Sequence, residues 1–257
     1  MTLGFLTDGD PADVAFASKE NFACVELALF GGPHPEHRYA EFKKALNDNG
    51  VELAAVSLFG QNYFEEKGGS EKRVLLAETI TLAAELGAKN MVFGTGTPPG
   101  NTLREKAKVG IEGLQESIAL AQSLGLSVSF YNCHWENFID RPDLWELTLP
   151  LVPGVGVKFD PSHPVQARRD WRAELLAAGP HLRHVHAKDV LEVGGKFISD
   201  PNPGLGDIDW GAFFGILYHV GYEGAVCIEP HSALYTGEKR HDFLRLSGRY
   251  LRQFLVS

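Results

Sequence analysis

The chain has 257 residues, of which 44% are hydrophobic and 22% are charged, a composition typical of a globular protein and unlike that of disordered or membrane-spanning chains. Asp and Glu outnumber Lys and Arg by 33 to 24, so the formal net charge is −9 at pH 7. Because non-specific binding to nucleic acid and to anionic lipid depends on basic groups, this charge opposes both kinds of partner.

The N-terminal segment and the cysteines bear on the expected location. Residues 1–8 lack a basic stretch followed by an apolar run and a small-residue cleavage site, so no signal peptide is expected. The three cysteines, Cys24, Cys133 and Cys227, are odd in number and form no zinc-type pair, which argues against a disulfide framework or a structural zinc site. We therefore expect a cytoplasmic protein with reduced cysteines.

Short apolar runs alternate with longer segments of helical period along the whole chain. In chain order, the expected strands are Leu3–Leu6, Ala23–Leu27, Glu52–Ser57, Asn90–Phe93, Ser127–Tyr131, Gly156–Phe159, His184–Ala187 and Ala225–Glu229. The expected helices between them include Glu36–Asn47, Glu71–Leu86, Leu103–Leu124, Trp210–Val220 and Lys239–Phe254. The chain is thus a series of strand and helix pairs.

This alternation predicts parallel strands joined by right-handed crossovers, and eight units favour a closed barrel over an open sheet. A barrel of this kind typically needs about 250 residues. Glycines that would end helices in the left-handed conformation follow several of the expected helices, at Gly50, Gly87, Gly125 and Gly221. No Gly-x-Gly-x-x-Gly motif follows the first strand, and no linker interrupts the chain. The predicted fold is a single (β/α)8 TIM barrel domain spanning residues 1–257.

Three strand ends carry polar side chains at the place where such barrels hold their functional residues. Asp160 ends the sixth strand, His186 lies near the end of the seventh, and Glu229 ends the eighth. Two carboxylates and an imidazole suit one divalent cation, with Mn²⁺ expected first and Mg²⁺, Co²⁺ or Zn²⁺ as alternatives. The structural alternative would require three independent buried polar groups, each costly to bury. We therefore expect a metal site.

Further polar residues flank these three. His184 lies lower on the seventh strand and is expected to be a hydrogen-bonded support rather than a ligand. Lys158 shares a strand face with Asp160, where an ion pair inside the barrel is favoured over a Schiff-base role. His163, Lys188 and His231 follow the strand ends and, with Lys158, are candidates for contact with a substrate, and His163 is also a candidate catalytic residue.

The second strand and two loops are less informative. Glu26 ends the second strand, where support of the barrel mouth and contact with a substrate are equally open. The loops at 59–64 and 95–100 offer hydroxyls, amides and aromatic rings suited to a polyol, but loops of that composition are also common. Neither contains an evident phosphate cradle.

These residues resemble those of the xylose isomerase-like TIM barrels, which include sugar-phosphate isomerases and epimerases, ketose 3-epimerases, inosose dehydratases and, more distantly, endonuclease IV. The resemblance covers nearly the whole chain and rests on Val25-Glu26-Leu27, the segment from Asp160 to His163, His184-Val185-His186 followed by Lys188-Asp189, the stretch Gly204–Trp210, and Gly221–Gly224 leading to Glu229. It implies metal ligands at Asp160, His186 and Glu229, and a contact of His163 with substrate or metal.

The fourth ligand of this family falls where the sequence departs from it. The epimerases end the fifth strand with Glu, and this chain has Tyr131 there. In some relatives the ligand lies a few residues later, which here points to Glu136, with its charge, or to Asn137, which aligns better with their Glu-Phe pair. His134 and Tyr131 then become candidates for proton transfer, and Trp135 and Tyr131 for contact with the substrate.

The resemblance implies a metal-dependent isomerase or epimerase of a small sugar or keto-sugar, acting through an enediolate, with Glu229 moving the proton. A dehydratase of a keto-inositol or keto-acid on the same fold is the alternative. The expected partner is a small sugar, with neither nucleic acid nor membrane, and a homo-oligomer remains open. A non-catalytic or nucleic-acid role is disfavoured because the net charge is acidic and the second and fourth strand ends lack the extra histidines of a three-zinc endonuclease.

Overall fold

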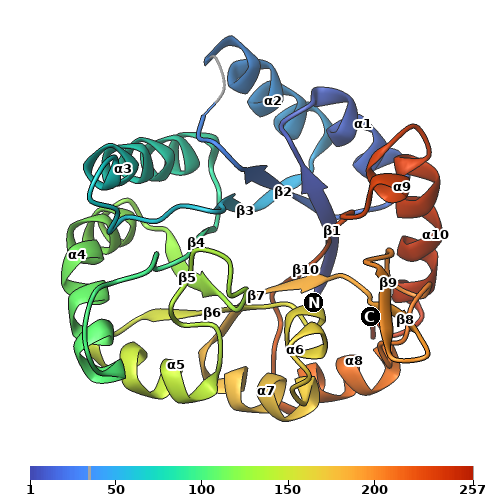
Figure 1. Cartoon of the computed structure of the whole chain (residues 1–257). Helices are drawn as coiled ribbons and strands as arrows, with labels where there is room; N and C mark the ends of the chain where they lie inside the picture. The colour runs from blue at the N-terminus through green and yellow to red at the C-terminus, as the bar shows by residue number, and fades with distance from the viewer. Residues whose placement is uncertain (34–35, 257) are drawn as a thin grey trace.

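The computed structural model describes residues 1–33 and 36–256. Eight parallel strands close into a barrel in the order β1-β10-β7-β6-β5-β4-β3-β2, and helices surround it (Figure 1). The barrel strands are β1 Thr2–Thr7, β2 Cys24–Leu29, β3 Glu52–Leu58, β4 Asn90–Phe93, β5 Ser127–Tyr131, β6 Val155–Phe159, β7 Leu182–Ala187 and β10 Ala225–Ile228. All eight strands expected from the sequence are therefore present, and the TIM barrel prediction is confirmed.

The helices fill the intervals between the strands. They are α1 Pro11–Lys19, α2 Glu36–Asn49, α3 Gly69–Leu86, α4 Leu103–Ser123, α5 Pro142–Thr148, α6 Ser162–Gln166, α7 Trp171–Ala178, α8 Trp210–His219, α9 Ala233–Thr236 and α10 Arg240–Arg252. The glycines expected to end helices at positions 50, 87, 125 and 221 all have positive φ, from 62° to 81°. Because glycine has no side chain, it adopts this left-handed conformation without a steric penalty.

Barrel closure depends on a close approach at Gly4. Residue Gly4 of β1 pairs with Cys24 of β2 on one side and with Cys227 of β10 on the other. A Cβ atom at Gly4 would lie 2.5 Å from the carbonyl oxygen of Cys24 and 2.6 Å from its sulfur. Glycine is therefore required for the neighbouring cysteine side chains to fill this part of the barrel interior.

An antiparallel hairpin that the sequence reading did not anticipate follows β7. Its strands are β8 Leu191–Val193 and β9 Lys196–Ser199, joined by Gly194 and Gly195, which both have positive φ. Such a two-residue glycine turn is typical of tight hairpins. Three large apolar side chains of the hairpin, Val193, Phe197 and Ile198, are more than half exposed.

The loop between β7 and α8 is held at its base by Asp189. This buried carboxylate accepts hydrogen bonds from the backbone N–H groups of Val190, Gly204 and Ile208 at 2.9–3.0 Å and from the indole of Trp210 at 2.8 Å. The shared contacts explain why Lys188-Asp189 and the stretch Gly204–Trp210 occur together in the sequence. They also fix the backbone next to Lys188.

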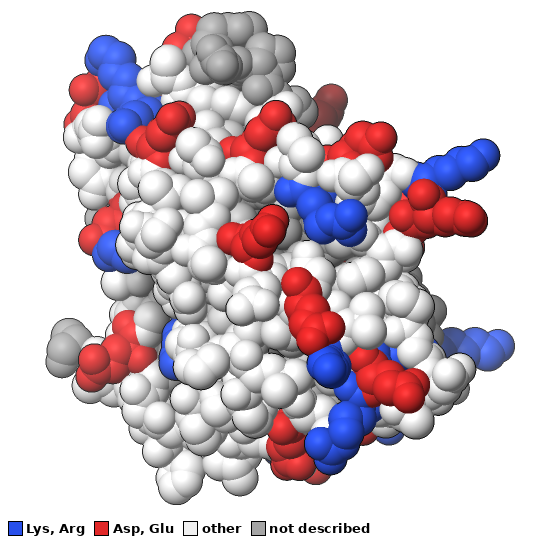
Figure 2. Space-filling model, turned by 90° about the vertical axis from the view of Figure 1, so that its left-hand side faces the viewer, with Lys and Arg blue, Asp and Glu red and all other residues white. Residues whose placement is uncertain are grey.

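The surface carries both signs of charge. On the face shown in Figure 2, acidic and basic side chains are interspersed, and the basic ones there do not gather into a patch that would track a phosphate backbone. Among the described residues, no helix is both long enough and apolar enough to cross a membrane.

Candidate active site

The carboxyl ends of β6, β7 and β10 bring together three of the side chains expected as metal ligands. Asp160 follows β6, His186 is the penultimate residue of β7, and Glu229 follows β10. One ligand atom from each lies within 4.8 Å of the other two. We call Asp160, His186 and Glu229 the mouth cluster. Two carboxylates so close together need positive charge beside them to remain ionised.

Asp160 is held so that one of its oxygens faces the cluster. Its backbone N–H donates to Asn132 Oδ1 at 2.9 Å, and its carbonyl oxygen accepts from Asn132 Nδ2 at 3.0 Å. Its Oδ1 accepts from the backbone N–H of Ser162 at 2.8 Å. Its Oδ2 is buried without a hydrogen bond of good geometry, although Lys188 Nζ lies 3.1 Å away. This Oδ2 atom is the oxygen available to a cation.

His186 is held at both ring nitrogens. Nδ1 lies 2.7 Å from Glu229 Oε2, and Nε2 lies 2.9 Å from both carboxylate oxygens of Glu26. Burial alone would lower the pKa of His186, but the two carboxylates raise it above its usual value. The two carboxylates therefore favour the protonated imidazole in the metal-free protein.

Lys188 supplies a second positive charge. Its Nζ lies 3.1 Å from Asp160 Oδ2 and 3.1 Å from Glu229 Oε1, and its side chain is 3% exposed. Burial opposes the charge, but the two carboxylates raise the pKa of Lys188 well above its usual value. Burial would raise the pKa of Asp160, yet Lys188 and its other basic neighbours lower it to about 2. An ammonium group thus bridges the two carboxylates of the mouth cluster.

Lys158 and His163 complete the surroundings of Asp160. Lys158 Nζ lies 3.8 Å from Asp160 Oδ2 inside the barrel and 6.0 Å from the centre of the Phe59 ring. His163 Nε2 lies 3.4 Å from the same oxygen. Burial lowers the pKa of His163 to about 3, against the attraction of Asp160, so its imidazole is neutral. Both side chains lie where the sequence reading expected contacts with the site.

The donor chemistry of the mouth cluster fits a divalent cation. Two carboxylates and one imidazole are hard and intermediate donors of the kind that Mn²⁺, Mg²⁺ and Zn²⁺ accept, and Asp160 Oδ2 is a buried acceptor that lacks a good hydrogen bond. The Lys188 ammonium contacts the same two carboxylates. A metal ion and this ammonium would therefore compete for Asp160 and Glu229.

The segment after β5 does not bring its candidates into the mouth cluster. Both ends of the Asn137 amide already have hydrogen-bond partners. Its Oδ1 accepts from the N–H and the hydroxyl of Thr95 at 3.0 and 2.9 Å, and its Nδ2 donates to the carbonyls of Tyr131 and Cys133 at 2.6 and 2.9 Å. The Tyr131 hydroxyl donates to the carbonyl of Trp135 at 3.1 Å. Burial raises the pKa of Tyr131 well above its usual value, so the phenol is neutral.

Three residues of the same segment lie nearer to solvent. His134 is exposed, Trp135 is 50% exposed, and Glu136 is partly exposed. Glu136 adopts a left-handed backbone with φ 45°, which is uncommon for a residue with a side chain. Its carboxylate is not part of the mouth cluster. Its role as a fourth ligand therefore stays a prediction, as does that of Asn137.

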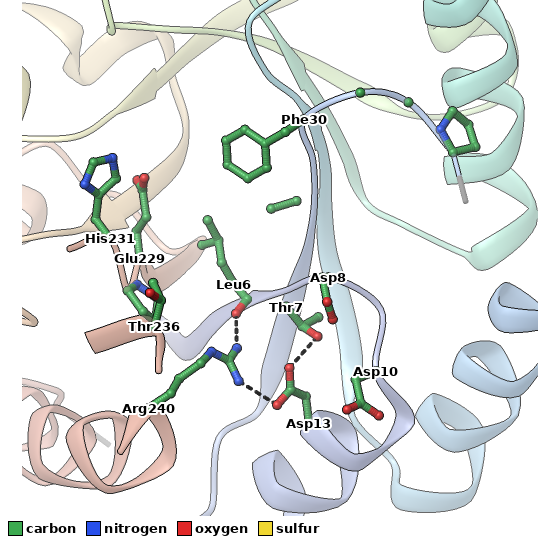
Figure 3. A pocket seen from close by; sticks show the side chains of 15 residues that line it. Leu6, Thr7, Asp8, Asp10, Asp13, Phe30, Glu229, His231, Thr236 and Arg240 are labelled. Carbon is green, nitrogen blue, oxygen red and sulfur yellow. Dashed lines mark hydrogen bonds and ion pairs between the residues drawn. The ribbon is translucent and has the colours of Figure 1, made fainter. Parts of the chain in front are cut away.

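A cavity of about 780 Å³ adjoins the mouth cluster (Figure 3). Glu229 and His231 line one side, and Asp10 lines the side formed by the loop after β1. The Arg240 side chain also lines the cavity but is bound to Asp13 and to a backbone carbonyl of β1. His231 Nδ1 lies 3.1 Å from Asp200 Oδ2. Of the mouth cluster, Glu229 is the member that reaches this cavity.

Sequence reasoning undervalued Glu26 and missed Asn132. Glu26 is fully buried in the middle of β2 and touches both histidines of β7. Asn132 is fully buried and joins the end of β5 to Asp160. The signal for Glu26 was present, because a carboxylate on an apolar inward-facing strand requires partners. The hydrogen bonds of Asn132 join residues that lie 28 apart in the chain and have no local signature.

Comparison with known proteins agrees with this architecture. A family model described as "Xylose isomerase-like TIM barrel" matches residues 14–252. The Bacillus subtilis (strain 168) protein YfiH is 25% identical over 268 residues, covering 83% of this chain and 86% of that protein. Two solved structures, each covered over 100% of both chains, are D-psicose 3-epimerase with D-tagatose from Clostridium cellulolyticum H10 (15% identity, TM-score 0.77) and IOLI protein with a binding zinc atom (16% identity, TM-score 0.80). The chain belongs to the xylose isomerase-like TIM barrel family.

Proposed function

We propose that the protein is a divalent-metal-dependent isomerase or epimerase of a small sugar or keto-sugar. The observation that carries the proposal is the convergence of Asp160, His186 and Glu229 at the mouth of the barrel, beside a cavity. Active sites of TIM-barrel enzymes lie at this end of the strands. The epimerase and the zinc-containing protein named above share the fold, and this analogy supports metal-dependent sugar chemistry for the present chain.

Asp160, His186 and Glu229 would hold the metal. When bound, a divalent ion polarises hydroxyl and carbonyl oxygens and stabilises negative charge that develops on them. Mn²⁺ is our first expectation because two carboxylates and an imidazole are the donors offered, and Zn²⁺ is the main alternative. As the fourth protein ligand we propose Glu136 rather than Asn137, because the Asn137 amide already hydrogen bonds to Thr95 and to two backbone carbonyls.

Glu229 is the residue that we propose moves the substrate proton. It reaches the cavity, whereas Asp160 is fully buried and held by Asn132 and Ser162. Burial would raise the pKa of Glu229, but Lys188, which donates to Oε1, and His186 lower it well below its usual value, so the carboxylate is ionised before substrate arrives. Displacement of this ammonium from Glu229 would strengthen the carboxylate as a base, because an adjacent positive charge weakens proton affinity.

The cavity suits a polyol better than a flat aromatic ligand. Glu229, His231 and Asp10 offer polar atoms around it, and Phe30 contributes an aromatic face that is 62% exposed (Figure 3). A sugar presents hydroxyls to the former and C–H groups to the latter. We therefore place the sugar in this cavity, with its reacting carbon next to Glu229.

The test is a substrate screen with the full chain loaded with Mn²⁺, run in deuterated water. Interconversion of a ketose or aldose, with deuterium appearing at the reacting carbon, is the expected result. Asp160→Ala should remove both turnover and bound metal, whereas Asp48→Asn, at an exposed carboxylate of α2, should change neither. Loss of water from the substrate would identify a dehydratase instead. Full activity and full metal content in Asp160→Ala would contradict the proposed site.

A further inference from the structure

Glu26 is a buried carboxylate beside the mouth cluster, and the proposed reaction gives it no role. It lies in β2 and is 0% exposed. The hydroxyl of Ser57, in β3, donates to one of its oxygens, and His184 Nε2 lies 2.6 Å from the other. His186 Nε2 lies 2.9 Å from both oxygens. Donors from the adjacent strand β3 and, across the barrel, from β7 thus offset the cost of burying this charge.

These contacts divide the two nitrogens of His186 between two carboxylates. Nε2 faces Glu26, and Nδ1 faces Glu229 in the mouth cluster. An imidazole that binds a metal through one nitrogen carries its proton on the other, and an acceptor for that N–H fixes both the tautomer and the ring orientation. The Phe59 ring packs edge-on against His186 at a centroid distance of 6.2 Å, so it restrains the ring but accepts no such proton.

We propose that Glu26 is a positioning residue: it accepts the Nε2 proton of His186 and so presents Nδ1 as the metal-binding nitrogen. The inference rests on the proposed metal-dependent function. It gives β2 a part in metal binding although the mouth cluster contains no residue of that strand. His184 contacts Oε2 of the same carboxylate, and His184→Asn offers a matched control, because asparagine can still donate an N–H to Glu26 and His186 Nε2 also faces Oε1.

The test compares Mn²⁺ binding by calorimetric titration in metal-free full-length wild type, Glu26→Gln, Glu26→Asp and His184→Asn. Glu26→Gln keeps the size of the side chain but loses its charge and gains a competing N–H donor. We expect its Mn²⁺ affinity to fall by about 10- to 100-fold, the usual effect of removing such a partner. Glu26→Asp retains a carboxylate and should recover part of the loss. His184→Asn should bind Mn²⁺ as wild type does.

A second measurement separates positioning from general packing. In zinc-loaded protein with isotope-labelled histidine, NMR identifies the coordinated nitrogen, and we expect Nδ1 of His186 in the wild type. Nε2 coordination there would overturn the proposal even if Glu26→Gln failed to fold. Wild-type Mn²⁺ affinity in folded Glu26→Gln would also overturn it, as would an equal loss in His184→Asn. If the wild type binds no Mn²⁺ at all, both the proposed function and this inference are wrong.

Discussion

Replacing Lys188 with methionine tests whether this ammonium balances the charge of the mouth cluster. Methionine has a similar length and no charge, so Asp160 and Glu229 would face each other without the ammonium that now lies 3.1 Å from each. Removing one partner of a buried ion pair costs about 3–5 kcal/mol, because the remaining charge is uncompensated. For a chain of this size, about 1 kcal/mol corresponds to about 2–4 °C in Tm, so the metal-free variant should melt roughly 6–20 °C below wild type.

Mn²⁺ should reverse much of this loss. In Lys188→Met the ammonium that contacts both carboxylates is gone and only Lys158, 3.8 Å from Asp160 Oδ2, remains beside them, so a divalent cation meets less competition and should bind more tightly than in wild type. Melting curves with chelator and with excess Mn²⁺ measure both effects. Lys188→Arg keeps the charge, and Lys108→Met removes an exposed lysine that is 71% accessible. An unchanged Tm in chelator, or an equal Mn²⁺ shift in Lys188→Met and wild type, would refute the reasoning.

Four further predictions follow from individual contacts. Glu229→Gln should keep part of its Mn²⁺ but lose deuterium exchange at the substrate carbon, because an amide coordinates weakly and is no base; unchanged exchange by NMR would remove Glu229 from that role. Asn137→Ala breaks four hydrogen bonds to backbone and hydroxyl groups, so it should lower the free energy of unfolding in urea by about 2–4 kcal/mol and leave Mn²⁺ affinity unchanged. Glu136→Gln should weaken Mn²⁺ binding about tenfold in calorimetric titration, because it removes the proposed fourth charged ligand, and wild-type affinity in this variant would exclude Glu136 as a ligand. His163 has a folded pKa of about 3 and an unfolded one near 6.5, so the unfolded state binds more protons between these values; stability should fall as pH drops through that window, and His163→Gln should flatten the slope measured by denaturation at several pH values.

The barrel could be predicted because each strand carries its own signal. Runs such as Ser127–Tyr131 are short, largely apolar and preceded by a helix-ending glycine, here Gly125, and the structure places β5 at the same residues. The hairpin Leu191–Ser199 carried a local signal too, since Gly194-Gly195 lies between two β-prone segments. It was not predicted because we assumed that a helix follows each strand directly, and this assumption excludes an antiparallel hairpin between β7 and the next helix.

The site was predictable at its strand ends but not in its contacts. Asp160, His186 and Glu229 could be named because polar residues at the ends of buried strands are unusual, and the structure brings them together. The bridge made by Lys188 could not be deduced, since it depends on where a flexible side chain ends in three dimensions. The sequence could not decide between Glu136 and Asn137, because the loop conformation depends on a left-handed backbone at Glu136 that the sequence does not indicate.

The Asp189 contacts indicate where the loop after β7 tolerates insertions and deletions and where it does not. Residues 190, 204, 208 and 210 are tied to one carboxylate, so insertions or deletions between 200 and 210 would pull on the backbone beside Lys188. Residues 191–199 form the hairpin, whose base is closed by the hydrogen bond from the Asp189 N–H to the Pro201 carbonyl, and the Glu192 N–H ties its first strand to Asp207. The turn at Gly194 and Gly195 is therefore the part of this loop that evolution or protein engineering can lengthen or shorten without moving Lys188.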